Sequence, residues 1–350
     1  MKATGLPLEI KNPVEKLLPA ATPTYFTEYG AAYTGDSIDL LKEVATESVS
    51  LVVTSPPYPL VFKKEYGNVD ADQYVRWIVG FVPEIRRILR TDGSFVLNLG
   101  GVWTKGAPVR SLVHYQVALE IAKQMPLAQE LFWYNPAKMP APAEWVNVRR
   151  IRVKDSVEFL WWFGKTDYPK ADNRGVLQPY SRDMHRLIAR GVRATVRPSG
   201  HNITKKFATD RGGSIPSNLI QAGNTDATSD YFQRSAEFEV KSHPARYPAA
   251  IPEFFVKLTT NPGEVVLDPF AGSNTTGFVA QQLKRRWIAF ELDTQYVESS
   301  MVRFPPTSVY GTQRYPKAAS GSDSPKKSST TNRRDFGQRA IKSDFTRLGS

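Results

Sequence analysis

The sequence predicts an α/β protein with a doubly wound, largely parallel sheet. Short apolar runs that end in small or proline-rich turns alternate with amphipathic segments at helical spacing. This alternation occurs twice, on either side of an irregular middle segment. The length of 350 residues agrees with it, because about 150 residues per domain give a prior of two compact units.

The first alternating half is predicted over residues 34–165. It starts with a buried strand over 50–54, an apolar run that ends just before two consecutive prolines. Apolar residues on one helical face predict a helix over about 72–89, which Thr91-Asp92-Gly93 ends before a strand in the run SFVLNL. The remaining elements are a helix between 111 and 125 and strands at 130–134 and 157–163.

The second half is predicted over residues 241–304. It follows an irregular folded region, 166–240, that is rich in turn residues. Its elements are a helix near 252–258, a strand in EVVLDPF, a helix in TTGFVAQQL, a strand in RWIAFEL and a helix over 294–303. Residues 1–33 form an N-terminal lead. Residues 305–350 are rich in Ser, Thr, Lys and Arg and are predicted to be a disordered basic tail.

The charge distribution favours a polyanionic partner. The chain has 46 Lys and Arg against 34 Asp and Glu, a net charge of +12. Residues 136–213 hold 16 basic and 7 acidic residues, and residues 305–350 hold 9 and 3, so the remainder is mildly acidic. We therefore expect one region that faces nucleic acid and one solvated appendage. A basic surface that only keeps the protein in solution is the alternative.

Composition also excludes several classes of protein. The chain has no cysteine, which excludes disulfides, thiolate zinc sites and a cysteine nucleophile. No run approaches the roughly 18 apolar residues of a membrane helix, and the N-terminus lacks the apolar core of an export signal, so we expect a cytoplasmic protein. The histidines are too scattered to indicate a metal site; they are His114, His185, His201 and His243.

A nucleoside-binding turn is predicted where the strand over 265–268 meets the next helix. In open α/β sheets, ligands bind beyond the carboxyl ends of the strands, and Gly272 lets backbone amides approach an anionic group. Glu291 ends the next strand 19 positions later, where an acid is placed to bind ribose hydroxyls. The turn lacks the G-x-G-x-x-G pattern and a P-loop lysine, which disfavours a dinucleotide or a nucleoside triphosphate. A tight turn with a surface acid is the alternative without function.

The motif Thr54-Ser55-Pro56-Pro57-Tyr58 is predicted to bind an amino group. Two consecutive prolines fix the backbone and leave a carbonyl without a local amide partner. That carbonyl and the Ser55 hydroxyl can accept hydrogen bonds, and Tyr58 offers a face on which a base can stack, worth roughly 1 to 3 kcal/mol. In isolation the motif could equally be a proline turn with a core tyrosine.

Together the two motifs resemble the amino-group DNA methyltransferases that use S-adenosylmethionine, over about residues 30–304. In that family a D/N/S-P-P-Y/F/W strand end faces the target amine. The amine motif here precedes the cofactor motif, with the basic segment between them, which is the permuted order of the β group. The resemblance implies a Rossmann-like methyltransferase domain with a catalytic half over 34–165, a target-recognition region over 166–240 and a cofactor-binding half over 241–304.

Two further elements match this family. Gly35-Asp36 stands where family members have a Gly-Asp whose acid reaches the adenine end of the cofactor, and His243-Pro244-Ala245-Arg246-Tyr247-Pro248 matches an element close to the methionine moiety. The resemblance thus implies S-adenosyl-L-methionine as cofactor. We assign its binding to Asp36, Asp268, Pro269, Phe270, Gly272, Ser273, Asn274, Thr275 and Glu291.

In having serine, Ser55, at the first position of the catalytic tetrad, the chain resembles the N4-cytosine enzymes of restriction-modification systems. Some N6-adenine enzymes also have serine at this position. The stretches 63–68, 151–155, 197–201 and 212–216 look similar to one modification methyltransferase of this group. In that relative the position of Asn98 is acidic and has been viewed as a proton-relay partner. An amide can orient Ser55 but cannot take a proton.

The resemblance implies that a cytosine is flipped out of duplex DNA and methylated on N4, with Ser55, Pro56, Pro57 and Tyr58 as the catalytic residues. We expect the base pocket to consist of Tyr58, Trp133, Tyr134 and Asn98, and DNA contacts from Lys63, Lys64, Arg149, Arg150, Arg152, Lys154, Arg182, Arg197, His201 and Lys205. The basic residues of 149–154 alternate as on a strand edge.

Other partners and functions stay open at this stage. A cognate restriction endonuclease would share the target site without needing to bind this protein, and the oligomeric state is not predicted. Carbon-5 methylation is excluded because it needs a cysteine nucleophile. The alternatives are an N6-adenine DNA methyltransferase, a nucleic-acid-binding module without activity, and an enzyme that acts on RNA.

Overall fold

A nine-stranded sheet forms the centre of the molecule in the computed structural model, which describes residues 11–58, 71–104, 106–191, 195–196, 202–203, 208–223, 230–245, 247–312 and 315–317. In sheet order its strands are β1 (Tyr25–Phe26), β2 (Gly30–Thr34), β11 (Arg286–Glu291), β10 (Val265–Asp268), β3 (Val49–Thr54), β4 (Leu89–Leu99), β6 (Val157–Gly164), β5 (Leu127–Tyr134) and β9 (Leu219–Gln221). The strands from β2 to β4 are parallel, and β6 runs antiparallel to both of its neighbours.

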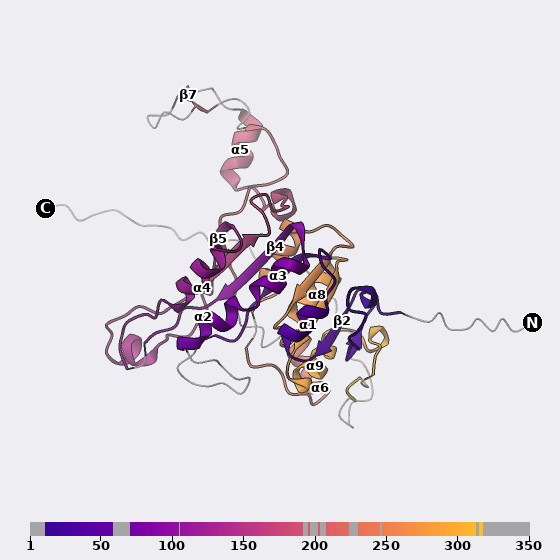
Figure 1. The fold of residues 1–350 in the computed structure, drawn as a ribbon. Helices are drawn as coiled ribbons and strands as arrows, with labels where there is room; N and C mark the ends of the chain where they lie inside the picture. Colours follow the sequence, from indigo (N-terminus) through magenta and orange to yellow (C-terminus); the bar gives the residue numbers. More distant parts are fainter. Residues whose placement is uncertain are drawn as a thin grey trace, which may run out of the picture.

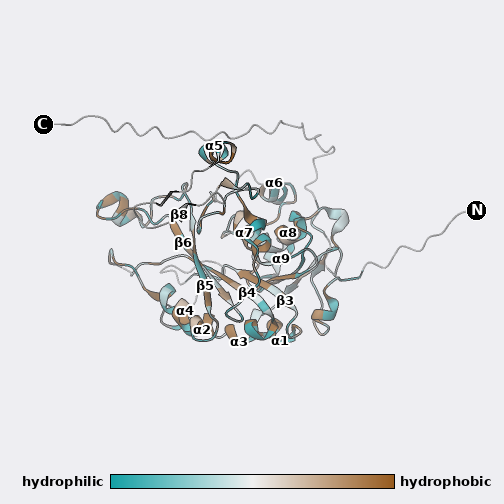
Figure 2. Cartoon of the chain, turned by 90° about the horizontal axis from the view of Figure 1, so that it is seen from above, coloured by the Kyte–Doolittle hydropathy of each residue, from teal (hydrophilic) through white to brown (hydrophobic). Residues whose placement is uncertain are grey.

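Helices cover both faces of this sheet, as Figures 1 and 2 show. One face carries α1 (Ser37–Glu43), α2 (Ala71–Val79), α3 (Val82–Ile88) and α4 (Val113–Ala122). The other carries α7 (Ala250–Thr259), α8 (Thr275–Gln282) and α9 (Thr294–Ser300), with α6 (Asp230–Glu237) beside them. Strand β3 packs against both layers, because Val52 points to the α1–α4 side while Leu51 and Val53 point to the α7–α9 side. The predicted doubly wound fold is confirmed.

The region over 166–240 contains more regular structure than predicted. Its strand β9 extends the main sheet by pairing in parallel with β5. Helix α5 (Arg182–Arg190) stands away from the sheet, and β7 (Thr195–Val196) pairs with β8 (Asn202–Ile203) in a separate ribbon (Figure 1). Within the described part of the chain, no helix has the length and apolar character that crossing a membrane requires.

The predicted helix over 72–89 is wrong in its continuity and in its end. The structure has two helices, α2 and α3, because Pro83 has no N–H to bond the carbonyl of Val79. The second helix ends at Ile88, and β4 begins at Leu89 rather than after Gly93. Leu89 pairs with Val49, and a register shift then accommodates Thr91-Asp92-Gly93 within the strand.

Two predicted boundaries also differ from the structure. The sheet begins inside the N-terminal lead, since β1 and β2 lie within residues 25–34 and β2 pairs with β11. The predicted disordered tail is folded over its first residues: Tyr310 exchanges backbone hydrogen bonds with Phe26, and the Tyr315 hydroxyl donates to the Phe304 carbonyl at 2.9 Å. The two rings of Phe26 and Tyr310 pack at 5.6 Å between centroids.

Candidate active site

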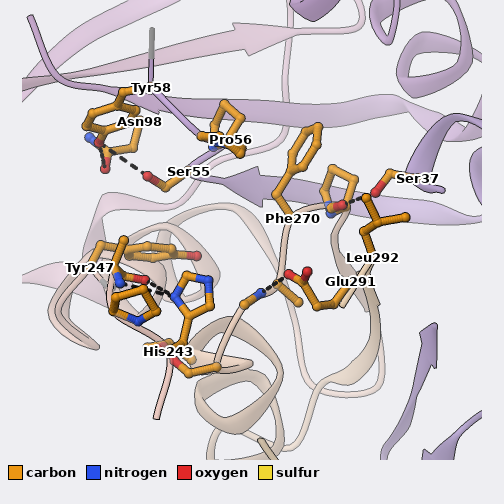
Figure 3. A pocket seen from close by; sticks show the side chains of 18 of the residues that line it. Ser37, Ser55, Pro56, Tyr58, Asn98, His243, Tyr247, Phe270, Glu291 and Leu292 are labelled. Atoms are coloured by element: carbon orange, nitrogen blue, oxygen red, sulfur yellow. Dashed lines mark hydrogen bonds between the residues drawn. The ribbon is translucent and has the colours of Figure 1, made fainter. Parts of the chain in front are cut away.

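A cavity of about 480 Å³ opens where the carboxyl ends of β3, β10 and β11 meet (Figure 3). Because these strands are adjacent and parallel, the turns that follow them share one edge of the sheet. Ser55, Pro269 and Leu292 follow the three strands and line the cavity. The two motifs predicted from sequence therefore form one site, although more than 200 residues separate them.

One end of the cavity is built around Gly272 and Glu291. The Gly272 amide donates to Glu291 Oε2 at 2.9 Å, and the Asp293 amide donates to Oε1 at 3.0 Å. Burial raises the pKa of the Glu291 carboxyl. Gly272 has φ +52°, which favours glycine, and a Cβ there would lie 3.2 Å from the His243 ring, a tight contact. This end of the cavity thus presents the Glu291 carboxylate beside the backbone of Gly272, which has no side chain of its own.

Aromatic side chains form the wall next to this carboxylate. The rings of Trp77 and Phe81 lie 5.5 and 5.1 Å from the ring of Phe270. Asp36 caps helix α1, accepting from the Ile38 amide at 2.8 Å, and Ser37 donates to the Pro269 carbonyl. The motifs do not predict Trp77, Phe81 and Ser37, because nothing in them indicates which residues of α1, of α2 and of the turn before α3 face the strand ends.

Asp268, one of the predicted cofactor residues, is not among the residues that line the cavity and instead bonds several neighbouring elements. Its side chain is buried and accepts from Thr54 Oγ1 and Thr276 Oγ1, each at 2.6 Å, and from the Phe270 amide at 3.0 Å. Burial raises its pKa, and these hydrogen bonds oppose that rise. Because Thr54 ends β3, the carboxyl group joins the ends of two strands and so positions Ser55.

Asn274 also lies outside the cavity wall. It adopts a left-handed conformation and caps α8, accepting from the Gly277 amide at 3.0 Å while its amide group donates to the Tyr25 hydroxyl at 3.0 Å. The other predicted cofactor residues line the cavity; they are Asp36, Pro269, Phe270, Gly272, Ser273, Thr275 and Glu291. His243 and Tyr247 line it as well.

The other end of the cavity holds a hydrogen-bonded polar cluster around Tyr58. Its hydroxyl lies 3.2 Å from Ser55 Oγ, 3.0 Å from Asn98 Oδ1 and 2.7 Å from Glu158 Oε2. Lys138 pairs with the second oxygen of Glu158 at 2.8 Å. Burial, followed by the charge of Glu158, raises the pKa of the Tyr58 phenol well above its usual value, so Tyr58 stays protonated. In Figure 3, Ser55, Tyr58 and Asn98 point toward one another.

Of the three aromatic residues predicted at the base pocket, Tyr58 and Trp133 line the cavity. Successive residues of a strand point to opposite faces, and Trp133 lies opposite Glu158 across β5 and β6. Its indole N–H donates to the Ala222 carbonyl at 2.9 Å. Tyr134 lies on the same face of β5 as Phe132 and is not among the residues that line the cavity, so its place at the base stays a prediction.

The predicted DNA-binding residues divide into three groups. Arg149 and Arg150 are exposed in the connection between β5 and β6, and Arg182 is exposed at the start of α5. Arg152 is largely covered and pairs with Asp155, and Lys154 donates to two backbone carbonyls. The expected strand edge is absent there, because residues 149–156 form an irregular connection between the helical turn over 144–148 and β6. Lys63, Lys64, Arg197, His201 and Lys205 lie outside the described residues.

A doubly wound sheet that holds a carboxylate and a Ser-Pro-Pro-Tyr turn in one cavity is the architecture of a nucleoside-cofactor methyltransferase. A family model described as DNA methylase, for N6 and N4 methylation, matches residues 49–302, and the chain belongs to this family. The predicted resemblance is thereby confirmed.

Known relatives extend over most of the chain. The type II methyltransferase M.PvuII of Proteus hauseri is 46% identical over 287 residues, which are 81% of this chain and 85% of that protein. The solved structure of the PvuII DNA methyltransferase, described as cytosine-N4-specific, has a TM-score of 0.67 and 40% identity, and covers 82% of this chain and 90% of that one. The DNA adenine methyltransferase YhdJ of Escherichia coli is 24% identical over 291 residues, 81% of this chain and 85% of that protein.

Proposed function

We propose that this protein is a type II DNA methyltransferase that transfers the methyl group of S-adenosyl-L-methionine to N4 of cytosine in duplex DNA. The observation that carries the proposal is the 46% identity to M.PvuII over 81% of the chain. The chain would serve as the modification enzyme of a restriction-modification system. It would work in the bacterial cytoplasm, where its DNA substrate lies, and a restriction endonuclease would share its target sequence.

The cavity fits this cofactor. Its wall of Trp77, Phe81 and Phe270 suits the flat apolar faces of adenine, and the half-buried Glu291 carboxylate suits ribose hydroxyls. When bound, S-adenosylmethionine supplies a methyl group on a sulfonium sulfur, which is itself the leaving group. Asp36, Gly272 and Glu291 would hold the nucleoside end, and His243 would lie toward the methionine end.

The polar end of the cavity would hold the target base. Ser55 Oγ and the Pro56 carbonyl follow β3 and can accept the two hydrogens of an exocyclic amine. Because the N4 lone pair is conjugated into the ring, these acceptors favour the pyramidal nitrogen that attacks a methyl group. Trp133 and the ring of Tyr58 provide faces that offset the few kcal/mol that base flipping costs. Arg149, Arg150 and Arg182 would contact phosphates.

The main competing function is N6-adenine methylation, which the 24% identity to YhdJ favours. Both amines present the same hydrogens to Ser55. The test is to incubate the protein with unmethylated duplex DNA and S-adenosylmethionine, digest the DNA to nucleosides and identify the methylated one by mass spectrometry. N4-methylcytosine is the expected product. N6-methyladenine would replace the proposed target base, and the absence of methylated nucleosides would overturn the activity.

A further inference from the structure

The cavity contains an acidic residue that the two motifs do not include. Glu158 is the second residue of β6, its side chain is 12% exposed, and it lies in the cavity wall. Its two carboxyl oxygens have different partners, with Lys138 Nζ at 2.8 Å from Oε1 and the Tyr58 hydroxyl at 2.7 Å from Oε2. A buried carboxylate is costly unless it is paired, and Lys138 balances its charge.

Sheet geometry brings Glu158 to the same hydroxyl as Asn98. Strands β4 and β6 are antiparallel, and Asn98 is paired with Leu160, so Glu158 is its diagonal neighbour on the same face. Asn98 donates through Nδ2 to the Phe159 carbonyl at 3.1 Å, which turns its Oδ1 toward Tyr58. An acid on either strand could therefore reach Tyr58, and in this chain the acid is on β6.

The number of hydrogens on each group fixes the donor-to-acceptor order of the hydrogen bonds in the cluster. The Tyr58 hydroxyl has one hydrogen, and the nearest acceptor is the Glu158 carboxylate, which makes the stronger, charge-assisted bond. The Tyr58 oxygen is then free to accept the hydrogen of Ser55, 3.2 Å away. If Glu158 is protonated, it can donate to Tyr58, which can donate to Asn98 Oδ1. The cluster can thus hold one additional proton in the same arrangement of heavy atoms, with only the hydrogens changing partners.

We propose that Glu158 is the final acceptor of the proton that the target amine loses on methylation. This inference rests on the proposed function. The bond between N4 and the methyl carbon forms while the donor's carbon–sulfur bond breaks, and sulfur keeps the electron pair. N4 gives one proton to Ser55 Oγ, Ser55 passes its own to Tyr58, and Tyr58 passes its own to Glu158. The partly exposed carboxylic acid then releases the proton to water.

The long Ser55–Tyr58 contact agrees with such a relay in a protein without its substrate. Hydrogen bonds between hydroxyls are usually 2.5–3.0 Å long, and catalytic hydrogen bonds often tighten only when substrate is bound. Glu158 acts through Tyr58 and Ser55, so it is a positioning and proton-accepting residue that does not touch the amine. The side-chain amide of Asn98 cannot accept the proton, and in this proposal Glu158 on the neighbouring strand β6 accepts it.

The test compares single-turnover methylation by the wild-type protein, Glu158→Gln, the double variant Asn98→Asp with Glu158→Gln, and the control Glu130→Gln on β5. We expect the wild-type rate to fall toward low pH, because the relay needs an ionised carboxylate at its end. Glu158→Gln should methylate about 100-fold more slowly, without this dependence on pH, and the double variant should recover about 10-fold with the dependence restored. Glu130→Gln should match the wild type. S-adenosylmethionine binding and thermal melting check that each variant folds.

Two results would overturn the relay. One is a Glu158→Gln rate within threefold of the wild type with the same pH profile. The other is a slow but folded Glu158→Gln variant that keeps the acidic limb, because Glu158 would then only hold Tyr58 in place. A wild-type protein that methylates no DNA would instead reject the proposed function, so the two failures are distinguishable.

Discussion

Ser55 connects the strand scaffold to the chemistry. Its hydroxyl lies in the cavity, its position is set by the Thr54–Asp268 hydrogen bond, and among the described residues it is hydrogen-bonded to Tyr58. We expect Ser55→Ala to reduce turnover by at least about tenfold, because the variant loses an amine acceptor but keeps the backbone. Cofactor affinity should barely change, as measured by isothermal titration with S-adenosylmethionine.

Ser308→Ala is a matched control, since among the described residues the Ser308 hydroxyl bonds within its own turn, donating to the Pro305 carbonyl at 2.8 Å. It should leave both turnover and cofactor affinity at wild-type values. A large loss of cofactor binding in Ser55→Ala would mean that the end of β3 belongs to the cofactor half of the cavity.

Residues with a local sequence signal could be predicted, and those placed by long-range packing could not. Ser55 and Gly272 are found because consecutive prolines or a glycine turn at a strand end has meaning without knowledge of the fold. Glu158 gives no such signal, since it reaches Tyr58 only through the antiparallel register of β4 and β6. Trp133 and Tyr134 are predicted together because a residue pair in a strand does not reveal which member faces the site.

At the scale of elements, helix α4 carries a buried ionisable group that should couple folding to pH. His114 is 1% exposed beside the rings of Tyr115 and Phe159, and neither ring nitrogen has a hydrogen-bond partner among the described residues. Burial, and then the charge of Arg110, lowers its pKa to about 4. The unfolded chain, with a pKa near 6.5, therefore binds more protons between these two values, and stability falls as pH drops through this window.

The variant His114→Phe should lose less stability on acidification. Between pH 7 and pH 4.5 we expect the wild type to lose about 2 kcal/mol more free energy of unfolding than the variant, measured by urea titration. The exposed His185 on α5 provides the control, and His185→Phe should follow the wild type. Equal losses in wild type and His114→Phe would show that His114 does not titrate in this window.

Element boundaries were harder to predict than element types. The apolar pattern over 72–89 continues through Pro83, and only the missing amide bond separates α2 from α3. Strand β2 has the sequence Gly-Ala-Ala-Tyr-Thr, with little strand preference of its own, and it forms because β11 offers an edge to pair with. The end of α2 thus depends on a single backbone hydrogen bond, and the existence of β2 depends on tertiary pairing.

At the scale of the whole molecule, the order of the motifs along the chain does not determine the site. Strand β10 inserts between β11 and β3, so the half over 241–304 and the half over 34–165 share one sheet. Cavity residues such as Asn98 and Glu291 come from different halves, and the site forms only when both halves fold together. The connection that carries Arg149 follows β5 at this same edge, which places basic side chains on the side of the cavity.

Two truncations can test whether different parts of the C-terminal segment, residues 305–350, contribute to folding and to DNA binding. Tyr310 and Tyr315 pack on the domain, so removal of 305–350 should lower the melting temperature, whereas removal of 318–350 should leave it unchanged. Residues 318–350 carry seven basic and three acidic residues. If their basic side chains bind DNA, the shorter truncation should reduce the slope of log affinity against log salt by about 0.9 for each phosphate that they neutralise. An unchanged slope in fluorescence-anisotropy titrations would show that phosphate binding comes from the folded domain alone, with Arg149 and Arg150 as the first side chains to substitute.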